Sequence, residues 1–302
     1  YLKSSSHNPK PETRNPKPKI LTIAGFDPSG GAGIIRDAAV IRDFGSDSYR
    51  MECLGVLTCN TIQNETTFES VHWLSQKEIE AQIDVLKEER VAVVKIGLTR
   101  DIEMIQFILN KVKSNFPKAK IVLDPILRTS SGFSMEHPDR YQDQKKWIEI
   151  IEQVDVLTPN WTEMQTISGN ENIEEMAKDP IAIGWSKFTA ICLKGGHSPH
   201  PEMDLLFVDG ERIEIKGRNE KLNSRHGSGC TFSTAFACAL AMGPGNYRDR
   251  LVEAARVAKN KTEEYLIEGS SEVRLKHKPM QSSLTPKRQT GRMTDDNKAK
   301  SL

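Results

Sequence analysis

The stretch KILTIAGFDPSGGAGII (19–35) indicates how this chain of 302 residues folds. Its residues 20–24 form a short run that is apolar except for Thr22, which is typical of a buried strand. Glycines follow directly, and helical periodicity then continues to about Phe44. A buried strand that turns through glycines into a helix is how strand–helix–strand units begin, and the rest of the chain continues in the same way.

Four further apolar runs have the length of strands. They are residues 91–96, 120–124, 154–157 and 190–193. Helical patterns lie at about 77–89, 101–113, 230–242 and 248–268. Residues 205–208 and 212–215 flank Asp209-Gly210, a pair typical of a β-hairpin turn. Near-continuous apolar strands that alternate with helices predict an α/β fold in which helices cover both faces of a mostly parallel sheet.

The two ends of the chain differ from the middle. Residues 1–18 and 270–302 are rich in Lys, Pro, Ser and Asn and lack apolar periodicity. Segments of this composition cannot bury enough apolar surface to offset the entropy of ordering. We therefore expect a single folded domain over residues 19–269, between a disordered N-terminal tail and a disordered C-terminal tail.

Composition argues against several classes of function. The 42 basic and 41 acidic residues leave a formal net charge of +1, and 6% of the residues are aromatic, so we expect no nucleic-acid partner. No apolar run reaches the ~20 residues that span a bilayer, so we expect no membrane partner. The five cysteines form no C-x-x-C pair, which is typical of free thiols in a reducing compartment and favours a cytoplasmic protein.

The glycine-rich loop after the first strand, residues 25–33, is the first candidate for a binding site. Its glycines let backbone N–H groups approach a ligand, and the start of the following helix favours an anion or a polar group. The loop lacks the Gly-Lys-Ser/Thr ending of a Walker A loop and the G-x-G-x-x-G spacing of dinucleotide-binding proteins. An ordinary tight turn between a strand and a helix explains the glycines equally well.

The segment His226-Gly227-Ser228-Gly229-Cys230 is the second candidate, because small residues here lead into an apolar helix. Unpaired N–H groups at such a helix start can hold the negative charge of a transferring phosphoryl group. The positive end of the helix would also lower the pKa of the Cys230 thiol, which could then act as a base or a nucleophile. A glycine helix start with a buried structural cysteine is the alternative, and local features do not decide between them.

Polar side chains follow three of the predicted strands. Asp124 ends one strand, Asn160 and Glu163 follow the next, and Lys194 ends a third. Open parallel sheets bind ligands at the carboxyl ends of their strands, so we expect these side chains close to one another and to Gly227–Cys230. Carboxylates suit Mg²⁺ and lysine suits phosphate oxygens, although each residue alone is more often a helix cap or a surface group. Together they predict one site for a phosphate and a metal.

These motifs, in this order, resemble the hydroxymethylpyrimidine and phosphomethylpyrimidine kinases of thiamine biosynthesis, which belong to the ribokinase-like superfamily. The resemblance covers about residues 19–268 and is specific in combination, although no single motif is. The motifs are AGFDPSGGAGI (24–34), KIGL (95–98), VLDPIL (122–127), SG (131–132), LTPNWTE (157–163), KGGH (194–197) and HGSGCT (226–231).

The resemblance implies a three-layer α/β/α fold, ATP and Mg²⁺ as cofactors, and a homodimer. It also implies two successive phosphorylations, first of the hydroxymethyl group of 4-amino-5-hydroxymethyl-2-methylpyrimidine and then of the resulting monophosphate. Positions that match the family's motifs receive the family's roles. They are Cys230 as catalytic base, Gly227, Ser228 and Gly229 as anion hole, Lys194, Asn160 and Glu163 for ATP, Asp124 and Glu163 for the metal, and Gly25 and Asp37 for the pyrimidine pocket.

Which residue would hydrogen-bond to the pyrimidine ring depends on how this segment is aligned with the family's motif. The family uses a glutamine in T-x-x-x-x-Q-N, which fits residues 58–64 with Gln63 as the reader if about five extra residues lie near 46–52. A gapless register places Thr58 there instead, and a shift by one matches residues 59–61. We favour Gln63, because an amide both donates to and accepts from an aminopyrimidine edge, whereas a thiol does this poorly.

Two other functions stay open at this point. Related enzymes phosphorylate the hydroxymethyl group of pyridoxal or pyridoxine, and Gln63 is the residue that favours a pyrimidine instead. A pyrimidine- or nucleotide-binding protein without catalysis is the second alternative. Lys194, Glu163 and Cys230 argue against it, because they are the residue types that the phosphoryl transfer needs.

Overall fold

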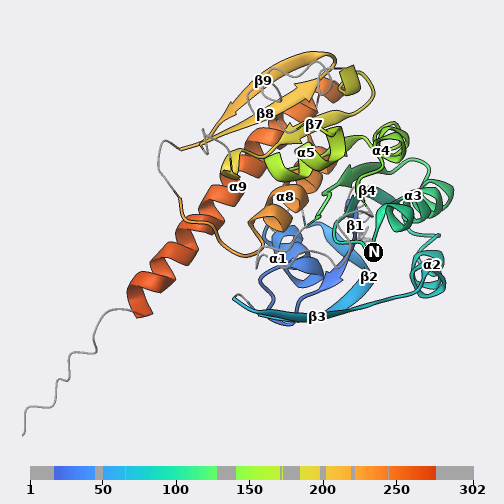
Figure 1. Ribbon diagram of the computed structural model, residues 1–302, viewed down its shortest axis with the longest axis horizontal. Helices are drawn as coiled ribbons and strands as arrows, with labels where there is room; N and C mark the ends of the chain where they lie inside the picture. The colour runs from blue at the N-terminus through green and yellow to red at the C-terminus, as the bar shows by residue number, and fades with distance from the viewer. Residues whose placement is uncertain are drawn as a thin grey trace, which may run out of the picture.

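The computed structural model describes residues 17–44, 50–64, 66–127, 141–170, 172, 184–197, 202–218, 222–243 and 245–276. Over this part of the chain one sheet of nine strands runs in the order β3-β2-β1-β4-β5-β6-β7-β8-β9 (Figure 1). The strands are β1 (Lys19–Phe26), β2 (Glu52–Gln63), β3 (Phe68–Trp73), β4 (Val91–Ile96), β5 (Lys120–Leu123), β6 (Val156–Leu157), β7 (Ala190–Leu193), β8 (Met203–Val208) and β9 (Glu211–Lys216). No helix within these ranges is long and apolar enough to cross a bilayer.

The middle of the sheet is parallel and its two edges are antiparallel. From β2 through β1, β4, β5 and β6 to β7, each strand runs parallel to its neighbour. β3 pairs antiparallel with β2, and the β8–β9 hairpin pairs antiparallel with β7. The hairpin turns at Asp209 and Gly210, whose φ angles of 53° and 78° suit the tight turns of two-residue hairpin loops. The predicted hairpin and the mostly parallel sheet are both confirmed.

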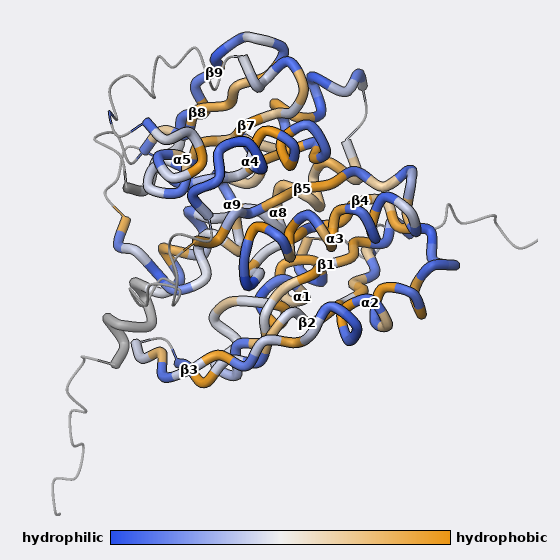
Figure 2. Tube along the Cα trace, turned by 45° about the vertical axis from the view of Figure 1, so that its right-hand side comes forward, coloured by the Kyte–Doolittle hydropathy of each residue, from blue (hydrophilic) through white to orange (hydrophobic). Residues whose placement is uncertain are grey.

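Helices cover both faces of the sheet, so the fold has three layers (Figure 1). One face carries α1 (Gly33–Phe44), α8 (Ser228–Met242) and α9 (Tyr247–Lys276). The other face carries α2 (Gln76–Asp84), α3 (Ile102–Asn115), α4 (Gln144–Ile151) and α5 (Trp161–Ser168). Alternate strand residues serve the two layers, because Ile20 and Val122 pack with α8 whereas Leu21 and Ile121 pack with α3. Burial on both faces gives the central strands the apolar sequence that predicted them, seen as orange runs in Figure 2.

Several elements differ from the expectation. The sequence does not predict β2 and β3, whose residues are largely half-buried or exposed, or α4 and α5, which have eight residues each. Helix α2 ends at Asp84 rather than at about 89. Helix α9 continues to Lys276, into the segment expected as the C-terminal tail, because Gly269 and two serines weaken a helix without ending it. Of the expected N-terminal tail the structure describes residues 17–18, and of the expected C-terminal tail it describes residues 270–276. The other residues of both tails lie outside the described part of the chain.

Candidate active site

A cavity of about 650 Å³ lies where the carboxyl ends of the parallel strands meet the N-terminus of α8. Parallel strands end at the same edge of the sheet, which is why residues far apart in sequence meet here. The expected site residues that line it are Gly25, Gln63, Asp124, Asn160, Glu163, Lys194, Gly227, Ser228, Gly229 and Cys230. The structure thus brings together every residue proposed for the site except Asp37.

A lysine joins two carboxylates in the wall of this cavity. Lys194, directly after β7, donates to Asp124 Oδ1 at 2.8 Å, and its Nζ lies 3.9 Å from Glu163 Oε2. Burial lowers the pKa of Lys194, but Asp124 and Glu163 outweigh this effect and the net change in pKa is upward. Burial, assisted by Asp124, raises the pKa of Glu163 to about 7 against the opposing effect of Lys194. The wall therefore holds a lasting positive charge beside a carboxyl group that is only partly ionised at neutral pH.

Asn160 and Glu163 begin helix α5 as a capping box. The Asn160 side chain accepts from the Glu163 N–H at 2.9 Å, and the Glu163 carboxylate accepts from the Asn160 N–H at 2.7 Å. A backbone bridge between Asn160 and Lys194 ties this helix start to the end of β7. The spacing of three residues between Asn160 and Glu163 is thus explained by the cap, which also holds the Glu163 carboxylate in the cavity wall.

Helix α8 begins without a polar side-chain cap. Gly227 precedes it with a φ of 79°, and a Cβ here would lie 1.8 Å from the carbonyl oxygen of Gly31, so only glycine fits. The Ser228 N–H already donates to a carbonyl oxygen at 3.2 Å. The N–H groups of Gly229 and Cys230 belong to the first turn, where N–H groups lack intrahelical partners. They are the donors at this helix start that suit an anion in the cavity.

Cys230 lies in this first turn with 7% of its surface exposed. Burial raises the pKa of its thiol to about 11, while Lys95 and the N–H of Gly33 act in the opposite direction. The expectation that the helix start lowers this pKa is therefore wrong for the protein without ligands, because loss of solvation outweighs the helix dipole. Cys230 is a neutral thiol at pH 7 until a ligand changes its surroundings.

Gln63, the last residue of β2, lines the cavity, and its Oε1 is buried without a hydrogen-bond partner among the described residues. Buried polar atoms without a partner are uncommon, so this oxygen is a candidate acceptor for a ligand donor. The other registers of the resemblance would give the ring-binding role to Thr58 or to a residue of 59–61, whose side chains are already hydrogen-bonded or lie outside the cavity. Thr58 donates to a backbone carbonyl oxygen at 2.6 Å, Cys59 is fully buried outside the cavity wall, and the Thr61 hydroxyl donates to a carbonyl oxygen at 2.8 Å.

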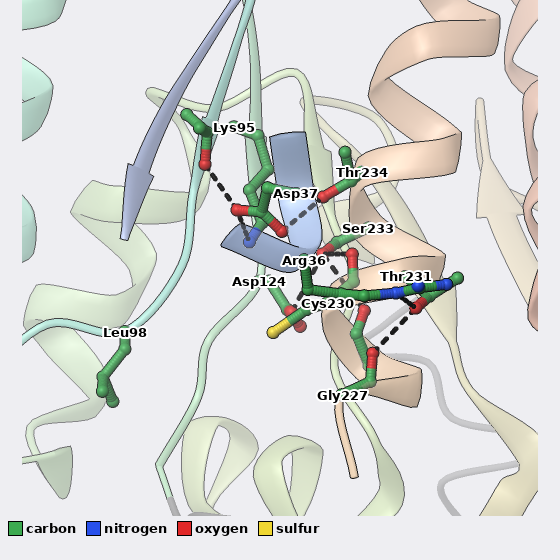
Figure 3. A network of polar contacts seen from close by, with 12 residues as sticks. Arg36, Asp37, Lys95, Leu98, Asp124, Gly227, Cys230, Thr231, Ser233 and Thr234 are labelled. Carbon is green, nitrogen blue, oxygen red and sulfur yellow. Dashed lines mark hydrogen bonds and ion pairs between the residues drawn. The ribbon is translucent and has the colours of Figure 1, made fainter. Parts of the chain in front are cut away.

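Asp37 does not line the cavity, and its expected place in the pyrimidine pocket is corrected. It lies inside the molecule on α1, where it accepts from Lys95 at 2.9 Å and from the hydroxyls of Thr22 and Thr234 (Figure 3). Lys95, at the end of β4, does line the cavity, although its side chain has no exposed surface. Asp37 therefore acts behind the wall, where it holds the charge of Lys95 in place.

The cavity wall contains a second cluster of buried charged residues, which the sequence does not predict. Lys259 of α9 lies 3.3 Å from Asp204 and 3.8 Å from Glu263, and all three line the cavity. Asp204 also accepts from the N–H of Gly195, and Glu263 accepts from the N–H of Arg218 at 3.0 Å. A lysine and a glutamate four residues apart on a helix are usually an exposed pair, so the sequence does not reveal that these are buried.

Asp124 and Glu163 are the carboxylates of this wall that suit a divalent cation. Mg²⁺ is usually held by one or two carboxylates together with the phosphates of a ligand, so this donor set fits it. Among the described residues no group of three His, Cys, Asp or Glu side chains forms a metal site of protein ligands alone. Asp124 and Glu163 would hold Mg²⁺ together with the phosphates of a ligand and water.

Comparison with known proteins shows the family of this chain. Residues 27–281 match the family model described as phosphomethylpyrimidine kinase. A hydroxymethylpyrimidine/phosphomethylpyrimidine kinase of Staphylococcus aureus (strain MSSA476) is 30% identical over 250 residues, which are 80% of this chain and 86% of that protein. The probable thiamine biosynthetic bifunctional enzyme of Oryza sativa subsp. japonica is 29% identical over 260 residues. The match covers 83% of this chain but only 44% of the rice protein, so the chain spans less than half of that relative.

Solved structures give the same result for the fold. The crystal structure of a phosphomethylpyrimidine kinase from Clostridium difficile 630 has a TM-score of 0.65 and 27% identity, and the match covers 84% of this chain and 100% of that one. An ADP complex of a Bacillus subtilis pyridoxal kinase has a TM-score of 0.64, but its 23% identity shows the fold alone. The three-layer ribokinase-like fold is confirmed. The chain belongs to the phosphomethylpyrimidine kinase family.

Proposed function

We propose that this protein is an ATP-dependent kinase that phosphorylates 4-amino-5-hydroxymethyl-2-methylpyrimidine and then its monophosphate, giving the pyrimidine diphosphate for thiamine biosynthesis. The observation that carries the proposal is one cavity that contains both the helix start at Gly227–Cys230 and the Gln63 oxygen, which has no hydrogen-bond partner within the part of the chain that the structure describes. The helix start suits a transferring phosphoryl group, and the oxygen suits an exocyclic amino group. Membership in the family supports the same reaction.

The pyrimidine is assigned through Gln63. Its Oε1 would accept from the 4-amino group, and its Nε2 would donate to the adjacent ring nitrogen, so one amide would pair with both groups of this aminopyrimidine edge. Pyridoxal and pyridoxine carry no amino group on the ring and would leave this acceptor without its partner. The structural likeness to pyridoxal kinases does not favour a pyridine substrate, since it extends to the fold alone.

The phosphate side of the reaction is assigned to six residues. Lys194 would contact the phosphates of ATP, and the N–H groups of Gly229 and Cys230 would hold the group in transfer. Asp124 and Glu163 would hold Mg²⁺ together with ATP, and this ion would neutralise charge on the phosphate oxygens. Asn160 would contribute through the cap that positions Glu163.

Cys230 would act as the base toward the hydroxymethyl group. The proton of the alcohol would pass to the Cys230 sulfur while the alcohol oxygen forms its bond to phosphorus and ADP leaves with the electrons of the broken P–O bond. Because burial keeps the thiol protonated at pH 7, it must first release this proton to solvent before it can take the proton of the alcohol. Lys95 and the N–H of Gly33 are the groups that favour this loss.

A homodimer and a cytoplasmic location are part of the same proposal. The homodimer follows from the resemblance, and the cytoplasmic location follows from the five cysteines without a C-x-x-C pair. A balanced net charge of +1 agrees with a small molecule rather than a nucleic acid as the partner. Light scattering of the purified protein would test the dimer, for which a mass near twice that of the chain is expected.

A substrate panel tests the proposed function. The purified protein is incubated with ATP and Mg²⁺ and with the pyrimidine alcohol, its monophosphate, pyridoxal or pyridoxine, and the products are identified by mass. We expect the monophosphate from the first substrate and the diphosphate from the second, with much slower turnover of the two pyridines. Preferential phosphorylation of pyridoxal would overturn the pyrimidine assignment, and binding of ATP without any product would favour a non-catalytic protein.

A further inference from the structure

One carboxylate links the glycine loop after β1 to the start of α8. Asp27 is 1% exposed, and its Oδ1 accepts from the N–H and the hydroxyl of Ser29 at 2.9 and 2.8 Å. Its Oδ2 accepts from the N–H of Ala32 at 2.8 Å and lies 2.8 Å from His226 Nε2. A carboxylate has about four lone-pair sites, so these contacts leave none for a metal or a substrate. The role of Asp27 therefore lies in the contacts themselves.

Hydrogen bonds hold both the imidazole ring and the backbone carbonyl group of His226. Its Nε2 faces a carboxylate that can only accept, so this nitrogen carries the proton of the contact. Its carbonyl oxygen accepts from the hydroxyl of Tyr265 on α9 at 2.8 Å. The side chains of His226 and Asp27 are 8% and 1% exposed, so water competes little for their hydrogen bond.

Two backbone contacts lie beside this pair. The carbonyl oxygen of Gly31 packs against Gly227, where a Cβ would lie only 1.8 Å away. The backbone N–H of Gly33 faces the Cys230 thiol and lowers its pKa. The loop after β1 and the start of α8 are thus interlocked along the edge of the cavity that both of them line.

We propose that Asp27 and His226 form a clamp that sets the position of the loop after β1 relative to the helix start that binds the transferring phosphoryl group. This inference rests on the proposed kinase function, in which the cavity lined by the loop after β1 takes the pyrimidine and the start of α8 holds the phosphoryl group. The clamp then determines whether the two reacting atoms meet, and a displacement of about 1 Å can cost on the order of 10²-fold in rate. His226 acts through the two loops and is a positioning residue.

Substitutions of His226 that differ in whether a donor nitrogen reaches Asp27 separate a positioning role from a merely structural one. His226→Leu removes the donor, His226→Gln places an amide nitrogen near the position of Nε2, and His226→Asn is too short to reach Asp27. We expect kcat to fall about 10- to 100-fold in the Leu and Asn variants, with KM for ATP and for the pyrimidine within about threefold of wild type. The Gln variant should recover kcat to within about threefold. His72→Leu, the same change at an exposed histidine of β3, should leave kcat unchanged.

Two results of these kinetics would overturn the clamp. The first is a Gln variant as slow as the Leu variant, because the donor at Nε2 would then be irrelevant. The second is an unchanged kcat with a raised KM in the Leu variant, because the residue would then bind substrate rather than position it. If His226→Leu does not fold, Asp27→Ala removes both acceptor oxygens of the clamp, and the same kcat and KM pattern is required of it.

Alkylation of Cys230 tests the clamp without any turnover. Iodoacetamide is added at pH 9 without ligands, and the Cys230 peptide is followed by mass spectrometry. Because the buried thiol is held by the interlocked loops, we expect at least tenfold faster alkylation in His226→Leu and a rate near wild type in His226→Gln. Equal rates in all three proteins would overturn the inference. A wild-type protein that phosphorylates no pyrimidine would refute the proposed function, and the alkylation result would still decide on the clamp.

Discussion

The ammonium group of Lys95 lies 2.9 Å from the carboxylate of Asp37, and neither side chain has exposed surface. Lys95 is the penultimate residue of β4, Asp37 belongs to α1, and Thr234 of α8 donates to the same carboxylate at 2.7 Å (Figure 3). Burial lowers the pKa of Lys95, but Asp37 and its other acidic neighbours outweigh this effect and raise the pKa. The lysine therefore stays charged behind Cys230, and the ion pair joins the sheet to the helices that form the back of the cavity.

Removing only one partner of the Lys95–Asp37 ion pair should strongly destabilise the fold. Lys95→Met leaves the Asp37 carboxylate buried without its counter-charge, so we expect the free energy of unfolding to fall by about 3–5 kcal/mol. The double variant Lys95→Met/Asp37→Asn removes both charges and should recover at least about 1 kcal/mol of this loss. Urea unfolding measures both. Lys261→Met, which breaks the exposed pair with Glu264, is the control and should cost less than about 1 kcal/mol. A double variant less stable than the single one would contradict this account.

Gln63→Met should weaken the binding of the pyrimidine more than the binding of ATP. The substitution keeps the length of the side chain but removes the buried oxygen that has no partner among the described residues. Loss of one or two neutral hydrogen bonds predicts about a 3- to 30-fold higher Kd for the pyrimidine alcohol, with ATP affinity unchanged. Calorimetric titration gives both constants. Ile62→Met, at an adjacent side chain that is 57% exposed, is the matched control and should change neither. Equal weakening of both ligands by Gln63→Met would mean that the register is wrong.

The parts of this structure that could be predicted share a physical cause. Strands buried on both faces must be apolar throughout, so β1, β4 and β7 are visible in the sequence. β2 is not, because its residues alternate irregularly between buried and exposed positions. Residues at strand ends, such as Asp124 and Lys194, were expected to meet because parallel strands end together.

The properties that could not be predicted depend on packing. Lys259 and Glu263 have the spacing of an exposed helical pair, and only the placement of β8 and of the segment after β9 against α9 buries them. The direction of the Cys230 pKa shift has the same origin. The helix start favours a thiolate, but the degree of burial decides the outcome, and burial is a property of the assembled layers.

Cys230→Ala should keep ATP binding and lose most turnover. If the thiol takes the proton of the acceptor alcohol, its removal should lower kcat by about 10²- to 10⁴-fold, the usual contribution of a general base. The Kd of ATP should stay within about threefold, because the N–H groups at the helix start do not depend on the side chain. Cys238→Ala makes the same change on α8 at a buried cysteine outside the cavity wall and should retain kcat. An unchanged kcat in Cys230→Ala would remove the base assignment.

The reactivity of Cys230 toward iodoacetamide should depend steeply on pH. Only the thiolate reacts, and burial raises the pKa of this thiol from 9.0 to about 11. Below the pKa the thiolate fraction rises tenfold for each pH unit, so the rate in the ligand-free protein should climb to about pH 10 without levelling. Mass spectrometry of the Cys230 peptide follows the reaction, and circular dichroism confirms that the protein stays folded. A plateau near pH 8 would show instead that the helix start overrides burial.

Gly227→Ala should disrupt the start of α8. The residue has a φ of 79°, which costs about 1 kcal/mol for a side chain with a Cβ, and the added carbon would lie 1.8 Å from the Gly31 carbonyl oxygen. Because backbone must move to relieve this contact, we expect more than about 2 kcal/mol of destabilisation in urea unfolding and a large loss of kcat. Gly196→Ala is the matched control, since nothing lies within 4 Å of a Cβ at that position, and it should change stability by less than about 0.5 kcal/mol. Equal stability of the two variants would mean that the loop after β1 yields easily and that its interlock with α8 is weak.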